Sequence, residues 1–199
     1  MPTRRKFVKN TVVGGIGLTL ATTAQSYARI MGSNDRINVG VMGTNSRGHA
    51  LTKVFMESDN VLVTHICDVD SLVIQKTTAM AQEVQGSKPV GEKDIRKVLE
   101  SSDLDLLVIA APDHWHAPAT IMALQSGKHV YVEKPCGHNA REGELMIDAQ
   151  KKYGLVVQMG NQQRSGAFAA AAIKDIKDGV IGTPYHARCW YANKRKSIG

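Results

Sequence analysis

The sequence has few cysteines, few aromatic residues and no long apolar run. Its three cysteines, Cys67, Cys136 and Cys189, lie far apart and form no C-x-x-C or metal-ligand spacing, so neither a disulfide framework nor a metal site is indicated. Aromatic residues make up 5% of the chain, and no basic stripe with interleaved aromatics occurs, so we expect no nucleic-acid partner. The remaining composition is that of an ordinary globular protein of 199 residues.

Acidic residues are absent from positions 1–28, which hold four of the basic residues: Arg4, Arg5, Lys6 and Lys9. Of the net charge of +7, this segment contributes +4, which leaves a mildly basic remainder. The uncharged stretch 10–27 is too short and too rich in Gly and Thr for a stable membrane span. The pattern Thr-Arg-Arg-x-Phe-x-Lys over 3–9 resembles a twin-arginine motif, and Ser26–Ala28 offers a cleavage site.

We therefore expect residues 1–28 to be a twin-arginine signal peptide, with the twin-arginine translocase as a partner and a periplasmic location. The alternative is a short basic amphipathic helix. Because this route exports folded proteins, it also favours a tightly held cofactor.

Short apolar runs alternate with segments long enough for helices. Strands are predicted at 37–42, 61–67, 104–110, 129–132 and 155–159, and helices at 46–57, 71–84, 93–101, 116–126, 139–152 and 166–178. Segments 85–91 and 110–118 are predicted to be loops, and a last strand is expected at 185–191. The alternation predicts an α/β fold of the Rossmann type, a doubly wound parallel sheet covered on both faces.

Several helix ends are marked by single residues. Asn139 stands three residues before Glu142, a capping pattern, and Asp70 is placed to cap the helix that follows it. Gly127 and Gly154 stand where a left-handed residue ends a helix.

The segment from Gly43 to Gly48, GTNSRG, follows the first predicted strand and opens a helix. In this context glycines let the backbone approach a pyrophosphate bound at the helix N-terminus. Asn45 replaces the middle glycine of G-x-G-x-x-G, and Asn tolerates left-handed backbone better than most residues. The predicted contacts to the dinucleotide in this segment are Gly43, Asn45, Ser46, Arg47 and Gly48.

Asp68 ends the next strand, twenty residues after Gly48, where a carboxylate can accept hydrogen bonds from both ribose hydroxyls. The glycine turn alone could be an ordinary strand-turn-helix connection, and Asp68 at this spacing favours a dinucleotide site. Asp68 would also repel a 2′-phosphate, and no arginine follows it directly, which favours NAD over NADP as the cofactor.

Two further polar segments follow the strands predicted at 104–110 and 129–132: Pro112–His116 and Glu133–Pro135. The carboxyl ends of parallel strands share one edge of a sheet, where ligands bind, so Pro112, His114 and His116 are candidates for lining the cofactor site. In the alternative interpretation, His116 caps the next helix and His114 faces solvent. Two histidines at i and i+2 do not form a metal site without a third ligand.

The run GKHVYVEKP from Gly127 to Pro135, preceded by Pro112–His116, resembles the Gfo/Idh/MocA family of oxidoreductases, and the resemblance extends from about Ile37 to Gly199. It implies a Rossmann domain that binds NAD(P) over 36–160 and the beginning of an incomplete α+β substrate and oligomerisation domain over 161–199.

In that family the lysine of the E-K-P motif points at the substrate hydroxyl beside the nicotinamide. The resemblance therefore implies that Lys134 is catalytic and binds substrate, whereas the alternative is a surface lysine. Glu133 would line the nicotinamide pocket or pair with Lys134. The segment 159–164 resembles the family's entry into its second domain, which implies Gln162 as a cofactor contact and Arg164 as a substrate contact.

Together, the expected signal peptide, Asp68 and the family resemblance lead us to expect an exported, NAD-dependent oxidoreductase acting on a hydroxyl of a sugar or cyclic polyol. Glycoside cleavage by oxidation and elimination is one alternative, and a non-catalytic dinucleotide-binding protein is another. The D-x-x-x-H pair that such enzymes usually carry is missing from this sequence. We therefore expect either a fragment or a truncated product, with homo-oligomers only for a full-length protein.

Overall fold

The computed structural model describes residues 36–190 and residue 192. The expected signal peptide, residues 1–28, lies outside the described residues. The described chain divides after Gly160 into two compact units. No helix in this part of the chain is long and apolar enough to cross a membrane.

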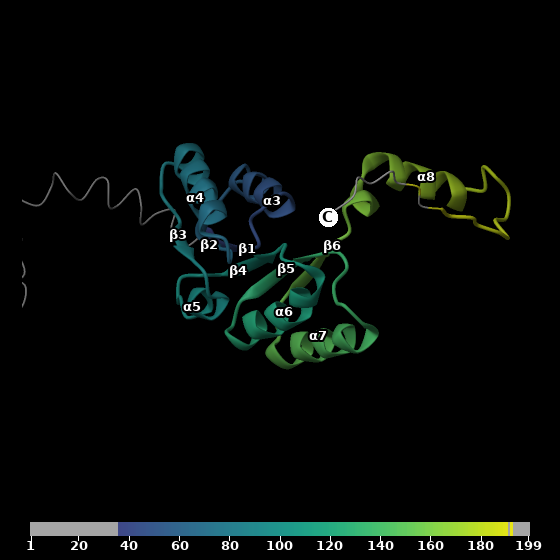
Figure 1. Ribbon diagram of the computed structural model, residues 1–199. Coiled ribbons are helices and arrows are strands. Elements are labelled where there is room, and N and C mark those ends of the chain that lie inside the picture. Colours follow the sequence, from purple (N-terminus) through teal and green to yellow (C-terminus); the bar gives the residue numbers. More distant parts are fainter. Residues whose placement is uncertain (1–35, 191, 193–199) are drawn as a thin grey trace, which may run out of the picture. The chain divides into compact units, whose positions relative to one another are not determined.

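The first unit is built on a parallel sheet of six strands in the order β3-β2-β1-β4-β5-β6 (Figure 1). The strands are β1 (Ile37–Met42), β2 (Val61–Cys67), β3 (Val90–Glu92), β4 (Leu106–Ile109), β5 (His129–Glu133) and β6 (Val157–Gly160). The order runs outward from β1 on one side and from β4 on the other. Open sheets of this kind bind ligands where that reversal occurs, at the carboxyl ends of the strands.

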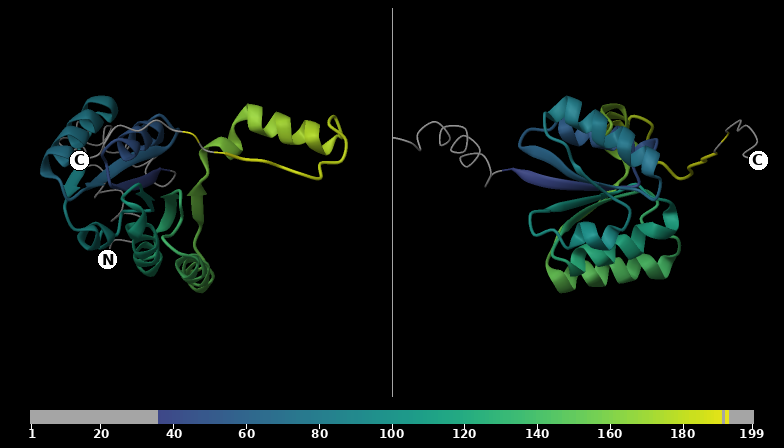
Figure 2. Two further views of the ribbon diagram at one scale, coloured as in Figure 1. Left: turned by 45° about the vertical axis from the view of Figure 1, so that its right-hand side comes forward. Right: turned by 60° about the vertical axis from the view of Figure 1, so that its left-hand side comes forward.

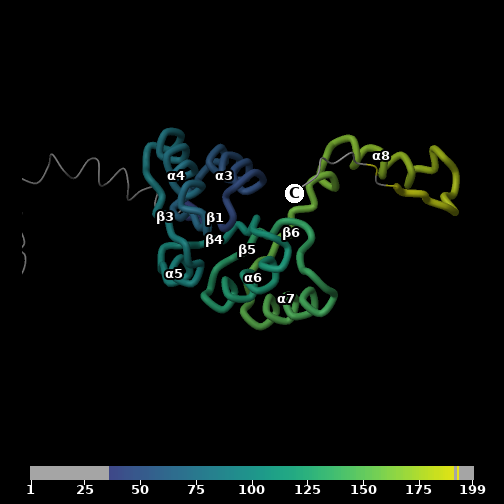
Figure 3. The backbone as a smooth tube through the Cα atoms, viewed as in Figure 1, coloured from purple at the N-terminus to yellow at the C-terminus, as the bar shows by residue number. Residues whose placement is uncertain are grey.

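Helices cover both faces of the sheet, as Figure 2 shows. One face carries α3 (Arg47–Met56) and α4 (Ser71–Gln85), and the other carries α5 (Ile95–Leu99), α6 (His116–Gln125) and α7 (Ala140–Tyr153). The smooth trace in Figure 3 follows each strand from β1 to β5 into the helix that leads to the next strand. The predicted Rossmann-type fold is confirmed.

The apolar core consists of two layers, one on each face of the sheet. Val39 and Val41 of β1 pack in the layer under α3, where Leu51 joins them. Met42, one position further along the strand, belongs to the layer under α5, α6 and α7. Because both faces are buried, the central strands are apolar at nearly every position, as the sequence pattern requires.

The predicted helix ends are confirmed. The side chain of Asp70 accepts a hydrogen bond from the N–H of Leu72, and that of Asn139 accepts one from Glu142. Gly127 and Gly154 have φ angles of 75° and 65°, which are left-handed.

Two predictions of local structure are wrong. β3 lies partly in the predicted loop 85–91, because three residues are enough to pair with the edge of β2. The strand expected at 185–191 is not present over 185–190. The described part of the second unit contains a short 3-10 turn, η2 (Gln162–Ser165), and α8 (Ala167–Lys177), but no strand with which this segment could pair.

Candidate functional site

The turn after β1 requires glycine at two positions. Gly43 has a φ of 78°, and a Cβ atom added there would lie 2.5 Å from the backbone nitrogen of Ala111. A Cβ atom on Gly48 would lie 1.7 Å from the carbonyl oxygen of Gly43. Strand, turn and helix therefore pack so closely that a side chain at either position would force them apart.

The middle of the turn differs from the expectation for Asn45. Ser46, not Asn45, takes the positive φ, 41°, while Asn45 Oδ1 accepts a hydrogen bond of 2.9 Å from the N–H of Ser46. Ser46 stands at the N-cap of α3 but makes no capping hydrogen bond with its side chain. The first turn of α3 also lacks an acidic residue, so its N–H groups favour an external anion.

Asp68 joins the turn after β1 to the turn after β2. Its Oδ2 accepts a hydrogen bond of 2.8 Å from the N–H of Thr44, and its Oδ1 accepts one of 3.1 Å from Asp70. A carboxylate oxygen accepts more than one hydrogen bond, so Asp68 can still receive the hydroxyls of a ribose. The hydroxyl of Thr44 is buried, and no hydrogen-bond partner for it is found among the described residues.

A cavity of about 790 Å³ opens at the carboxyl ends of β1, β2 and β4. Four of the predicted site residues line it: Gly43, Asp68, Pro112 and His114. Its volume lies in the range of cofactor and ligand sites. The glycine turn from Gly43 to Gly48, the acceptor Asp68 and the size of the cavity all fit a dinucleotide.

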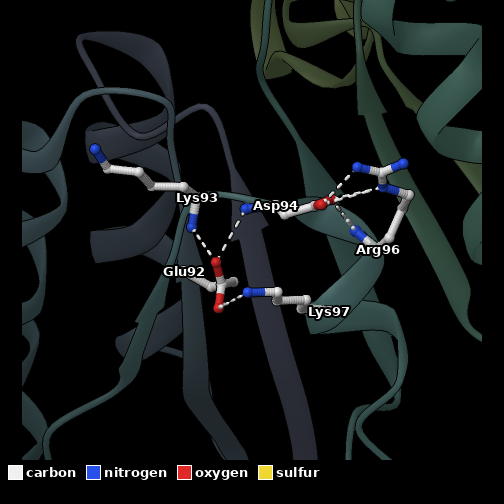
Figure 4. A network of polar contacts seen from close by, with 5 residues as sticks. All are labelled: Glu92, Lys93, Asp94, Arg96 and Lys97. Atoms are coloured by element: carbon white, nitrogen blue, oxygen red, sulfur yellow. Dashed lines mark hydrogen bonds and ion pairs between the residues drawn. The ribbon is translucent and has the colours of Figure 1, made fainter.

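Residues 93–96, in the segment after β3, also line this cavity. Figure 4 shows the polar contacts within this segment. Glu92 Oε1 accepts hydrogen bonds from the N–H groups of Lys93, at 2.7 Å, and Asp94, at 3.2 Å. Asp94 caps α5 and binds the Arg96 guanidinium at 2.6 Å. Hydrogen bonds from the side chain and the backbone N–H of Arg96 lower the pKa of Asp94 to about 2, so this carboxylate is charged at neutral pH.

The sequence did not reveal two parts of the cavity wall, the segment 93–96 and Trp115. The residues of the segment carry no motif of their own. Trp115 had a signal, since it stands between the two candidate histidines at a strand end and is one of only two tryptophans in the chain.

Arg47 and Glu133, predicted as separate cofactor contacts, form an ion pair. Arg47 Nη2 and Nε lie 2.7 and 2.8 Å from Glu133 Oε1. The side chain of Glu133 is 5% exposed, whereas that of Arg47 is 44% exposed. Close by, Tyr131 packs edge-on against Phe55, and burial together with the charge of Glu133 raises the pKa of its hydroxyl. The Arg47–Glu133 ion pair joins the start of α3 to the end of β5.

His116 is buried and bridges two loops. Its Nε2 lies 2.8 Å from the carbonyl oxygen of Ala111, after β4, and its Nδ1 lies within hydrogen-bond distance of the carbonyl oxygen of Pro135, after β5. The side chain does not cap α6, because His116 is the first residue of that helix. Its role in cofactor binding stays a prediction, and the observed contacts give it a positioning role.

Lys134 is exposed and directly follows β5, at the same edge of the sheet as Gly43 and Asp68. Gln162 and Arg164 belong to η2 in the second unit. The roles predicted for these three residues stay predictions. Within residues 36–190 and 192, no group of three His, Cys, Asp or Glu side chains is arranged to hold a metal ion.

Residues 37–161 match the model of the GFO_IDH_MocA oxidoreductase family, which is described by its NAD-binding Rossmann fold. The chain belongs to this family. The chain is also similar to curated relatives. It is 25% identical over 225 residues to a glycosyl hydrolase family 109 protein from Saccharopolyspora erythraea, and the match covers 94% of this chain and 49% of the relative. A glycosyl hydrolase family 109 protein 2 from Shewanella sp. (strain ANA-3) is 26% identical over 210 residues, which cover 96% and 46% of the two chains. The chain thus spans about half the length of these relatives.

Solved structures of the family share the fold. A myo-inositol 2-dehydrogenase from Lactobacillus plantarum superposes with a TM-score of 0.65 at 22% identity, over 74% of this chain and 42% of that one. The WlbA dehydrogenase from Bordetella pertussis, solved with NADH and UDP-GlcNAcA, gives a TM-score of 0.65 at 24% identity, over 73% and 41%.

Proposed function

We propose that the intact protein is an exported, NAD-dependent dehydrogenase that oxidises a hydroxyl group of a sugar or cyclic polyol. One observation carries this proposal: the cavity lined by Gly43 and Asp68 and the strand end that carries Lys134 share one edge of the sheet. The substrate class is supported by the inositol dehydrogenase and the nucleotide-sugar complex among the similar structures.

NAD is proposed over NADP because of Asp68. A 2′-phosphate on the ribose held by Asp68 would bring like charges together at a half-buried site. The family's description as NAD-binding and the NADH in the Bordetella structure support this choice.

When bound, the dinucleotide supplies the acceptor for a hydride from the substrate carbon. Gly43, Gly48 and the first N–H groups of α3 would hold its pyrophosphate, and Asp68 would hold its adenosine ribose. Lys134 would take the proton that leaves the substrate hydroxyl at its Nζ atom. A positioned acid–base group of this kind is worth about 10²–10⁴-fold in rate.

Export through the twin-arginine route is part of this proposal and rests on Arg4 and Arg5. Free NAD is not expected outside the cytoplasm, so the cofactor would be reduced and reoxidised without leaving. That requires a second, electron-accepting substrate. A reporter fused behind residues 1–35 tests the route: replacing Arg4 and Arg5 with Lys should stop export, and continued export as an unfolded chain would overturn this part.

Glycoside cleavage by oxidation, elimination and reduction is the second candidate, favoured by the glycosyl hydrolase family 109 proteins among the relatives. This cycle would leave the cofactor unchanged after each turnover and need no second substrate. A third candidate is binding of the dinucleotide without turnover.

One set of assays on the exported protein separates the three candidates. Nucleotide released on denaturation should be NAD. A dehydrogenase reduces an artificial electron acceptor when supplied with polyols or sugars, whereas a glycosidase releases nitrophenol from aryl glycosides without any acceptor. Bound NAD with neither activity would support the third candidate, and the absence of bound or bindable NAD would overturn the dehydrogenase proposal.

A further inference from the structure

Trp115 is a large apolar residue that the fold leaves partly exposed. It ends a short 3-10 turn, η1 (Asp113–Trp115), in which its backbone N–H donates a hydrogen bond of 2.8 Å to the carbonyl oxygen of Pro112. Its side chain remains 41% exposed and forms part of the wall of the 790 Å³ cavity. The backbone hydrogen bond fixes the backbone of Trp115 beside the cavity, and the residue stays partly exposed there.

The rest of this part of the cavity is largely apolar. Met122 of α6 and Ile95 of α5 contribute to the wall from the same face of the sheet, and Val69, 85% exposed, follows the ribose acceptor Asp68. Apolar walls around a half-exposed indole suit a flat, weakly polar ring rather than a phosphate or a free sugar.

Two basic residues, Lys93 and Arg96, line this cavity, and Arg96 is held by an acidic neighbour. Three hydrogen bonds of 2.6–3.1 Å from the side chain of Arg96 go to the carboxylate of Asp94 (Figure 4). The guanidinium is thus already paired with a carboxylate.

The covalent structure of a dinucleotide decides which group lies in this space. Its adenine is bonded directly to a ribose, and Asp68 is placed to accept hydrogen bonds from the hydroxyls of that ribose. A ribose held at Asp68 therefore carries its base into the cavity that Asp68 and Trp115 both line.

We propose that Trp115 forms the aromatic wall of the adenine pocket, with Val69 and Met122 as the other apolar surfaces. This inference rests on the proposed dinucleotide function and adds the residue that recognises the base. Stacking of a base on an aromatic side chain is worth about 5- to 150-fold in affinity.

Tryptophan fluorescence provides a readout that does not depend on catalysis. The chain has two tryptophans, so Trp190→Phe leaves Trp115 as the only one. In the full chain with this change, ADP-ribose and AMP should quench the fluorescence saturably, whereas nicotinamide mononucleotide should not. Quenching by nicotinamide mononucleotide but not by AMP would overturn the proposal, because it would place Trp115 beside the other half of the cofactor.

Calorimetric titration with ADP-ribose measures what the ring contributes. Trp115→Ala should weaken binding by about 10-fold or more, Trp115→Phe should stay within about 3-fold of the unmodified chain, and the control Trp190→Phe should bind normally. Circular dichroism checks that each variant is folded, and Trp115→Leu replaces Trp115→Ala if the latter unfolds. Unchanged affinity in a folded Ala or Leu variant would overturn the inference alone. No binding of ADP-ribose to the unmodified chain would overturn the proposed function as well.

Discussion

Breaking the Arg47–Glu133 ion pair from its two sides should cost unequal amounts of folding free energy. Arg47→Met removes the cation from a carboxylate whose side chain is only 5% exposed. Removing one partner of a fully buried pair costs about 3–5 kcal/mol. Because Arg47 itself is 44% exposed, its loss also opens a path for water, and we expect about 2–3 kcal/mol.

The opposite change should be milder. Glu133→Gln leaves the guanidinium of Arg47 with water at its exposed side and keeps an acceptor near it, so we expect a loss of about 1 kcal/mol. In the double variant no buried carboxylate remains. The double variant should therefore lose less free energy of unfolding than the sum of the two single variants, by about 1–2 kcal/mol.

Urea denaturation measures these differences from the midpoints, provided the slope of each transition is unchanged. Arg141→Met is the matched control: it breaks a surface pair of 2.6 Å with Glu144, in which both side chains are more than 60% exposed. Its cost should stay below about 0.5 kcal/mol. The reasoning is refuted if Arg47→Met costs no more than Arg141→Met, or if the two single losses simply add.

Three further predictions concern the cavity and the strand ends. In calorimetric titration, Asp68→Ala should weaken NAD binding by about 1–3 kcal/mol and reduce the difference in binding free energy between NAD and NADP. Tighter binding of NADP than of NAD by the unmodified chain would contradict this prediction. Lys134→Met in the full-length protein should lower the rate of cofactor reduction by about 10²–10⁴-fold and leave NAD affinity nearly unchanged, whereas an equal loss of NAD binding would make it a cofactor anchor. Burial raises the pKa of Cys67 to about 12, so mass spectrometry after alkylation at pH 8 should find Cys67 unmodified and the exposed Cys189 modified.

What could be predicted from the sequence depended on short-range pattern. The strand from Ile37 and the turn at Gly43 are encoded within a dozen residues, and Asp68 follows at a spacing set by one strand-helix-strand unit. β3 was missed because its pairing depends on the neighbouring edge of β2 more than on its own three residues. The strand at 185–191 was predicted wrongly for the converse reason: its alternation suits a strand, but a strand forms only where a partner is available.

The side-chain contacts of the site were beyond the sequence. Arg47 and Glu133 are 86 positions apart, and both had a reason to be assigned to the cofactor, so nothing in the pattern indicated that they bind each other. The sequence offered His116 as a cofactor contact or a helix cap, and no pattern indicated that its ring would bridge two backbones. Such pairings follow from three-dimensional proximity, which single motifs do not encode.

The bridge made by His116 has a consequence for engineering the domain. Ala111 and Pro135, the two residues it joins, stand within four positions of Trp115 and next to Lys134, respectively. The loop that carries the proposed base wall and the loop that carries the proposed proton acceptor are thereby tied to one imidazole. Replacing either loop alone with that of a relative would disturb one of the two hydrogen bonds of His116. To transfer cofactor specificity from a relative, both loops and His116 should therefore be exchanged together.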